Sequence, residues 1–101
     1  MEFIKEFKTA FNAPEEDFKA IYSIRMTDSG RNLVLEVSGK NLKCYYGDTD
    51  KADVTATTNR DTVSTITRGR ATFQGCFMSS RITCKGDFKL LRTFDQLFRF
   101  V

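Results

Sequence analysis

Residues 69–87 read GRATFQGCFMSSRITCKGD and carry the strongest information about the fold. Gly69 is typical of the position just after a helix, and a second short helix, Phe73 to Met78, follows it. The stretch Arg81 to Lys85 is predicted to be a strand. Gly86 then leads to Asp87, whose carboxylate can cap a further helix. Helix, strand and helix therefore follow one another closely and bring wide apolar surfaces together.

The helix after Asp87 is predicted to run to the C-terminus and to be apolar over most of its circumference. A helix of this kind is buried on more than one side, or it faces something apolar that is not protein. Its apolar residues are Phe88, Leu90, Leu91, Phe94, Leu97, Phe98, Phe100 and Val101.

The part of the chain before Gly69 is predicted from its periodicity. Phe3, Phe7 and Phe11 recur every four residues and indicate a helix over residues 2–11. Alternation of apolar and polar residues then indicates four strands, and Thr58 or Asn59 can cap a helix over residues 60–68. The strands are predicted at residues 18–27, 33–38, 42–46 and 51–57. The element order is thus α-β-β-β-β-α-α-β-α, an α+β fold.

The composition is that of one soluble domain over residues 1–101. With 41% hydrophobic and 29% charged residues, the chain has no apolar run near the roughly 18 residues that span a bilayer. The N-terminus has no continuous apolar segment, so a cleaved signal peptide is not expected and we predict a cytoplasmic protein. Cys44, Cys76 and Cys84 form an odd set without C-x-x-C spacing, so we expect them to be small core residues.

Histidine is absent, which excludes a Ser-His-Asp triad, a Cys-His pair and an imidazole metal ligand. Asp53, Asp87 and Lys85 are the residues that could in principle be catalytic, but Asp87 is better explained as a helix cap and Asp53 as a surface strand residue. We therefore expect no catalytic residues, no metal site and no cofactor, and we expect that the protein is not an enzyme.

Charge is distributed unevenly along the chain. Residues 1–59 carry 8 basic and 10 acidic side chains, whereas residues 60–101 carry 8 basic and 3 acidic side chains. Aromatic residues on a sheet can stack bases, and Lys43, Tyr45 and Tyr46 lie on one predicted strand. Because these tyrosines belong to the acidic half and the formal net charge of the chain is only +3, no nucleic-acid partner is expected.

Four segments of the chain together resemble the sterol carrier protein-2 (SCP-2) family: Lys51 to Thr57, Gly69-Arg70, Cys76 to Met78, and Ile82 to Asp87. The first half matches by the order of its elements, and the chain resembles a stand-alone prokaryotic-type member. Two positions depart from the family's pattern. Ser80 stands where the family usually has glycine, and Phe73 stands where it often has proline, so the ligand's identity is not carried over.

The resemblance implies a mixed five-stranded β-sheet covered on one face by helices, with an apolar tunnel between the sheet and the C-terminal helices. Such a tunnel would bind or transfer a fatty acid, acyl-CoA, sterol-like or isoprenoid lipid without catalysis. The alternative for every candidate lining residue is ordinary core packing. The candidates are Phe73, Phe77, Met78, Ile82, Phe88, Leu91, Phe94 and Phe98.

Basic residues cluster in sequence around the expected mouth of this tunnel. Arg70, Arg81 and Lys85 are candidates to hold a lipid's carboxylate or phosphate, or to bring the protein transiently to an anionic membrane. A solvated basic face is the alternative. A second function of a different class is an accessory domain that packs against a lipid-metabolising enzyme and has no ligand of its own. The oligomeric state is left open.

Overall fold

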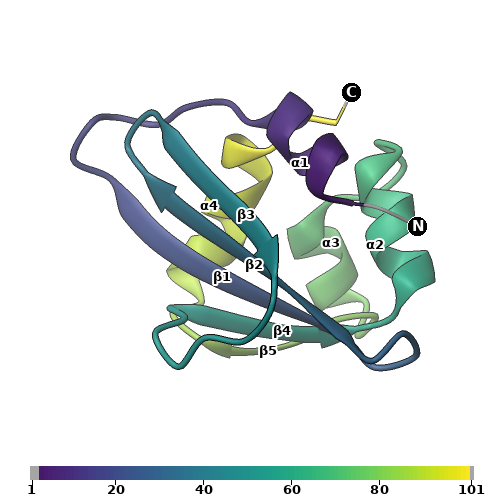
Figure 1. The fold of residues 1–101 in the computed structure, drawn as a ribbon. Helices are drawn as coiled ribbons and strands as arrows, with labels where there is room; N and C mark the ends of the chain where they lie inside the picture. The colour runs from purple at the N-terminus through teal and green to yellow at the C-terminus, as the bar shows by residue number, and fades with distance from the viewer. Residues whose placement is uncertain (1–2, 101) are drawn as a thin grey trace.

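The computed structural model describes residues 3–100 and contains four helices and five strands within that range (Figure 1). Their order is the one predicted from the sequence. The elements are α1 (Ile4–Ala10), β1 (Lys19–Met26), β2 (Arg31–Ser38), β3 (Asn41–Tyr46), β4 (Val54–Thr58), α2 (Arg60–Thr67), α3 (Phe73–Met78), β5 (Thr83–Gly86) and α4 (Lys89–Leu97).

The five strands form one mixed sheet in the order β3-β2-β1-β4-β5. Strands β1, β2 and β3 form an antiparallel meander, β4 pairs with β1 in parallel, and β5 closes the other edge antiparallel to β4. The parallel pair requires a crossover. Residues 47–53 provide it by passing across the face of the sheet opposite the helices (Figure 1).

The register of the sheet places an alternating set of apolar residues from each strand on the face that the helices cover. Tyr22 of β1 lies opposite Leu35 of β2 and Val54 of β4, and all three are buried. Side chains from α1, α2, α3 and α4 join these residues in one hydrophobic cluster. The α+β class and the helix-covered mixed sheet are therefore confirmed.

Strands β4 and β5 begin three and two residues later than predicted because neighbouring backbone groups are already paired. Asp53 donates its amide to the Ile21 carbonyl and accepts the Ile21 amide on its carboxylate, both at 2.8 Å, so β4 begins at Val54 and not at Lys51. The amides of Arg81 and Ile82 donate to the Cys76 carbonyl, so β5 begins at Thr83.

The prediction that the last helix runs to the C-terminus is wrong. Helix α4 ends at Leu97, and Phe98 is extended and forms a β-bridge with Phe11 after α1. The Arg99 amide then donates to the Ala10 carbonyl at 2.9 Å. Val101, which the prediction included, lies outside the described residues. At the other end, the Asp87 carboxylate accepts the Lys89 amide at 3.0 Å, as expected of a residue that caps the helix.

Helix α2 ends with a left-handed glycine, as the sequence predicts. Gly69 has φ +73°, its amide donates to the Ile66 carbonyl, and the Arg70 amide donates to the Thr65 carbonyl. These two hydrogen bonds form a Schellman motif, which satisfies carbonyls that have no partner within the helix. Glycine adopts this backbone conformation at no steric cost.

Helix α3 ends with the same motif, but serine occupies the left-handed position. Ser80 has φ +66°, its amide donates to the Phe77 carbonyl, and the Arg81 amide donates to the Cys76 carbonyl. A side chain in this conformation costs roughly 1 kcal/mol relative to glycine. Serine in place of the glycine expected at position 80 therefore puts a strained residue at the end of α3.

We expect Ser80→Gly to raise the free energy of unfolding by about 0.5–1 kcal/mol, because glycine removes this strain while it adds some flexibility to the unfolded chain. Gly69→Ser, at the matching position of α2, should lower it by a similar amount. Urea unfolding monitored by circular dichroism measures both changes. If both substitutions changed the free energy of unfolding in the same direction, Ser80 would not be strained in the way proposed.

Candidate functional site

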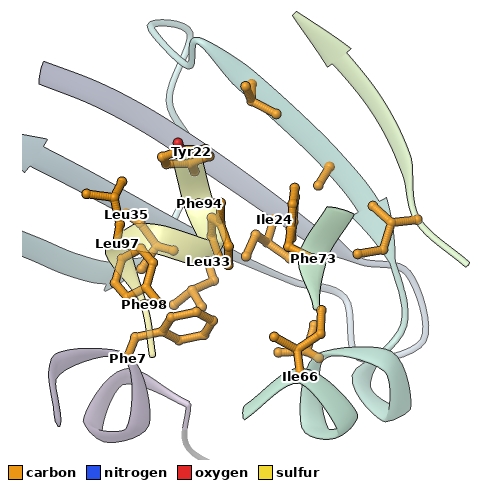
Figure 2. Packing of buried hydrophobic residues seen from close by; sticks show 14 of the residues in the cluster. Phe7, Tyr22, Ile24, Leu33, Leu35, Ile66, Phe73, Phe94, Leu97 and Phe98 are labelled. Carbon is orange, nitrogen blue, oxygen red and sulfur yellow. The ribbon is translucent and has the colours of Figure 1, made fainter. Parts of the chain in front are cut away.

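A layer of aromatic rings fills the space between the sheet and the helices, with Phe94 of α4 at its centre (Figure 2). The ring of Phe94 stacks on Phe73 of α3 with centroids 4.2 Å apart. It also meets Phe98 at 5.0 Å and, edge to face, Tyr22 of β1 at 5.1 Å. The sheet, α3 and the end of α4 are thus joined through one side chain.

The single polar atom that Tyr22 brings into this layer already has a partner. Its hydroxyl donates to the Leu90 carbonyl at 2.8 Å. Burial, and secondarily the charge of Asp53, raises the pKa of Tyr22 well above its usual range, so the phenol stays neutral. Among residues 3–100, no buried side-chain nitrogen or oxygen lacks a hydrogen-bond partner. The surface that the interior would present to a ligand is therefore apolar.

The structure divides the eight candidate lining residues into two groups. Five lie in the hydrophobic cluster and are at most 3% exposed: Phe73, Ile82, Leu91, Phe94 and Phe98. The other three lie where α3 ends and α4 begins. Phe77 is half-buried and contacts Phe88 at a ring distance of 5.7 Å, whereas Met78 and Phe88 are 75% and 57% exposed. We call Phe77, Met78 and Phe88 the α3–α4 edge.

A carboxylate of α4 also binds the first turn of helix α3. Asp95 of α4 accepts the amides of Phe73 and Gln74 at 2.7 and 3.0 Å, and the hydroxyl of Thr72 caps the same helix end through the Gly75 amide. Proline has no amide hydrogen. Phenylalanine in place of the family's frequent proline therefore allows this chain to make the bond to Asp95.

The three headgroup candidates do not form one cluster. Arg70 precedes α3 and lines an open groove beside Phe98. Arg81 follows the other end of α3, where its carbonyl accepts the Thr58 hydroxyl at 3.0 Å. Lys85 pairs in register with Thr55, so its side chain lies on the face of the sheet opposite the helices.

Sequence reasoning missed the cations that lie beside Arg70. Arg99 lines the same groove, and a neighbouring groove is lined by Lys5 and again by Arg99. No sequence signal could have placed Arg99 there, because the last helix was expected to continue through it. The pairing of Phe98 with Phe11, 87 positions away, brings Arg99 beside α1.

The cysteines and carboxylates give this site no evident chemistry of their own. Cys44, Cys76 and Cys84 are buried, as predicted, and burial raises the pKa of Cys84 to about 11, so its thiol stays protonated at neutral pH. Asp53 and Asp87 accept backbone amides. Within residues 3–100, no group of three His, Cys, Asp or Glu side chains could hold a metal ion.

The helices are short, and α4, the longest of those described, has nine residues. Among residues 3–100, none meets the length and apolarity that a membrane-crossing helix needs.

The fold is shared with solved structures of low sequence identity. The palmitated SCP2L2 of Aedes aegypti in solution superposes with a TM-score of 0.73 at 18% identity, over 98% of this chain and 96% of that one. UbiJ-SCP2, a ubiquinone synthesis protein, superposes with a TM-score of 0.63 at 13% identity, over 93% of this chain and 75% of that one. At these identities the likeness shows the fold alone.

A larger enzyme contains the same fold. The sec-alkylsulfatase Pisa1 of Pseudomonas sp. matches with a TM-score of 0.80 at 18% identity, over 95% of this chain. The chain spans only 16% of that sulfatase's length, so the match concerns one part of the enzyme.

The sequence itself gives the more specific comparison. No curated protein sequence matches the chain. Residues 6–99, however, match the model of the SCP-2 sterol transfer family, which is nearly the whole chain. The chain belongs to the SCP-2 sterol transfer family.

Proposed function

We propose that this protein is a non-catalytic cytoplasmic carrier that shields the apolar part of a lipid between the sheet and helices α3 and α4. Residues 1–101 make one lipid-binding domain in this proposal. The lipid is a fatty acid, an acyl-CoA, a sterol-like molecule or an isoprenoid. Membership of the SCP-2 family supports the proposal, and the observation that carries it is the layer of aromatic rings around Phe94, in which the Tyr22 hydroxyl already has a partner.

Side chains occupy this layer in the structure, so a lipid must take the place of some of them. Keeping an empty space ready would be costly, since a void of 150 Å³ destabilises a domain by about 3–4 kcal/mol. The lipid-free protein is therefore closed, and the lipid enters as rings such as Phe73 and Phe98 change their packing. A bound lipid at a hundredfold excess over its dissociation constant stabilises the protein by about 2.7 kcal/mol.

The direct test is native mass spectrometry of gently purified protein, followed by solvent extraction. We expect a stoichiometric mass excess that resolves into fatty acids or isoprenoids. A clean protein mass that persists after incubation with acyl lipids, together with an unchanged melting temperature, would overturn the carrier function. The melting temperature is included because a lipid lost in the gas phase would still have stabilised the protein in solution.

We also infer that the α3–α4 edge makes transient contact with anionic membranes. Met78 and Phe88 are exposed apolar side chains, and the exposed cations Arg81 and Lys89 follow them closely in sequence. Apolar tips flanked by positive charge fit the interface of an anionic bilayer, where each cation contributes about 1 kcal/mol.

The double variant Met78→Ser, Phe88→Ser is expected to weaken binding to phosphatidylglycerol vesicles at least about tenfold, because burying one such side chain contributes roughly 1.5–3 kcal/mol. Vesicle co-sedimentation at two salt concentrations measures the loss. Gln74→Ser, at an exposed polar position of α3, is the control for a serine substitution that leaves the apolar side chains and the net charge unchanged. Equal binding by the double variant and the wild type would exclude the α3–α4 edge as the contact.

The second candidate function is an accessory domain that packs against a lipid-metabolising enzyme. The likeness to one part of the sulfatase Pisa1 favours it, since this fold occurs there within a larger enzyme. The exposed α3–α4 edge would then be the partner's contact. A protein that never carries lipid, but whose capture of one defined enzyme is lost in the Met78→Ser, Phe88→Ser variant, would establish this function instead.

A further inference from the structure

The three residues after α4 close the space between α1 and α2. Phe98 bridges to Phe11 and Arg99 bonds to Ala10, so this segment runs beside the end of α1. The next residue, Phe100, turns its half-buried ring onto the core. It meets Phe7 of α1 edge to face at 5.3 Å and lies parallel to Phe98 at 6.5 Å.

Phe100 separates two open grooves. One lies between α1 and the segment, with Lys5 and Ala10 in its walls. The other lies between α2, the α2–α3 connection and the segment, with Ile66 and Arg70 in its walls. Both grooves have Arg99 and Phe100 as a common wall. Withdrawal of the Phe100 ring would therefore join them into one slot, with Phe7 and Phe98 at its floor.

The attachment of Phe100 is weaker than that of the residues before it. Within residues 3–100, the backbone hydrogen bonds of this segment end at the Arg99 amide, and Phe100 is held by the packing of its ring against Phe7, Phe98 and the hydrophobic cluster. Two aromatic contacts contribute on the order of 1 kcal/mol each beyond the area they bury. An apolar chain that offers Phe7 and Phe98 the same contacts can replace the ring at little cost.

The charges at the grooves favour one kind of occupant. Lys5, Arg70 and Arg99 line them, against the carboxylates of Glu6 and Asp95. Asp95 already accepts two amides of α3. The ion pair found among residues 3–100, Lys40 with Glu16, involves none of these cations. The grooves thus combine an apolar floor with three cations against two carboxylates, and none of these cations is in an ion pair found among residues 3–100.

We propose that Phe100 is a displaceable plug over the opening through which an acyl chain with an anionic head enters, and that Arg70 and Arg99 hold the head. The inference rests on the proposed carrier function and locates its entrance between α1 and α2. The ring occupies the opening in the lipid-free protein. The acyl chain pushes it out and reaches the rings around Phe94 by way of Phe7 and Phe98, whose ring centroids lie 6.1 and 5.0 Å from that of Phe94.

The absence of tryptophan allows the plug to be observed directly. Phe100→Trp introduces one indole at the plug, and Phe11→Trp introduces one at a half-buried phenylalanine that contacts Phe98 but lines neither groove. On addition of palmitate, we expect the emission at position 100 to shift to the red and iodide quenching to rise. At position 11 both changes should be much smaller, because Phe11 lines neither groove.

The binding kinetics give an independent measurement. If the open form is populated at 1–10%, Phe100→Ala should raise the apparent affinity for palmitate about tenfold or more, through faster association. Phe11→Ala, which also removes a half-buried ring, should leave it near the wild-type value. The double variant Arg70→Glu, Arg99→Glu should weaken binding of palmitate but not of hexadecanol, which has the same chain and no charge.

The outcomes separate this inference from the proposed function. Palmitate binding with no response at position 100, and with equal affinity for wild type and Phe100→Ala, would overturn the plug and leave the carrier function standing. If no variant binds palmitate or hexadecanol, both are wrong. A fall in affinity and stability together in Phe100→Ala would show that the ring is only part of the core.

Discussion

Phe94→Ala is expected to lower the free energy of unfolding by about 3–5 kcal/mol, the range for truncating a buried phenylalanine. Phe94 is 1% exposed and its ring contacts Phe73, Phe98 and Tyr22 at once. Its removal leaves a cavity where the sheet, α3 and the end of α4 meet, and a domain of this size is stable by only about 5–15 kcal/mol. Chemical denaturation at 25 °C measures the loss.

Phe88→Ala is the matched control, because it removes the same side chain at the beginning of the same helix from a position that is 57% exposed. We expect it to change stability by less than about 1 kcal/mol. Similar losses of unfolding free energy in the two variants would show that the side of α4 that carries Phe94 is not the side that packs on the core. In the carrier function, palmitate should also restore more stability to Phe94→Ala than to Phe88→Ala, because the new cavity is apolar.

The sequence was sufficient for the element order because each strand and helix has its own periodicity. It was not sufficient for the end of α4. Phe94, Leu97 and Phe98 continue a helical spacing, so Phe98 and Phe100 fitted the helix pattern. Their position is determined by Phe11 and Ala10 at the far end of the chain. Periodicity within a segment carries no information on such a contact.

The candidate site was predictable in its residue types but not in its arrangement. All eight candidate lining residues are apolar, yet Phe94 is buried while Met78 and Phe88 are exposed. The difference follows from the short length of α3 and from the bond that ties Phe73 to Asp95, neither of which hydropathy reports. Arg70 and Lys85 also looked equivalent until the strand register placed Lys85 on the opposite face of the sheet.

Gly86→Ala is expected to destabilise the protein by roughly 3–5 kcal/mol, through a steric collision added to a backbone conformation that costs a side chain about 1–3 kcal/mol. Gly86 has φ +114°, and a Cβ built there would collide with the carbonyl oxygen of Asp53. That carbonyl is fixed, because it accepts the Asp87 amide at 2.9 Å, while the Asp53 carboxylate is bound to the Ile21 amide. The collision therefore strikes the point where β1, β4, β5 and the start of α4 are joined.

Gly30→Ala is the control that measures the cost of the left-handed backbone conformation without a steric collision. Gly30 has φ +68° in the β1–β2 turn, and nothing lies within 4 Å of a Cβ built there, so its replacement should cost only about 1 kcal/mol. Thermal unfolding of the two variants under identical conditions gives the difference. If Gly86→Ala were no worse than Gly30→Ala, the Asp53 carbonyl would be free to move and β5 would not be anchored through it. A larger loss shows that the approach of Gly86 to Asp53 fixes β5 and the start of α4, next to Phe88 of the α3–α4 edge.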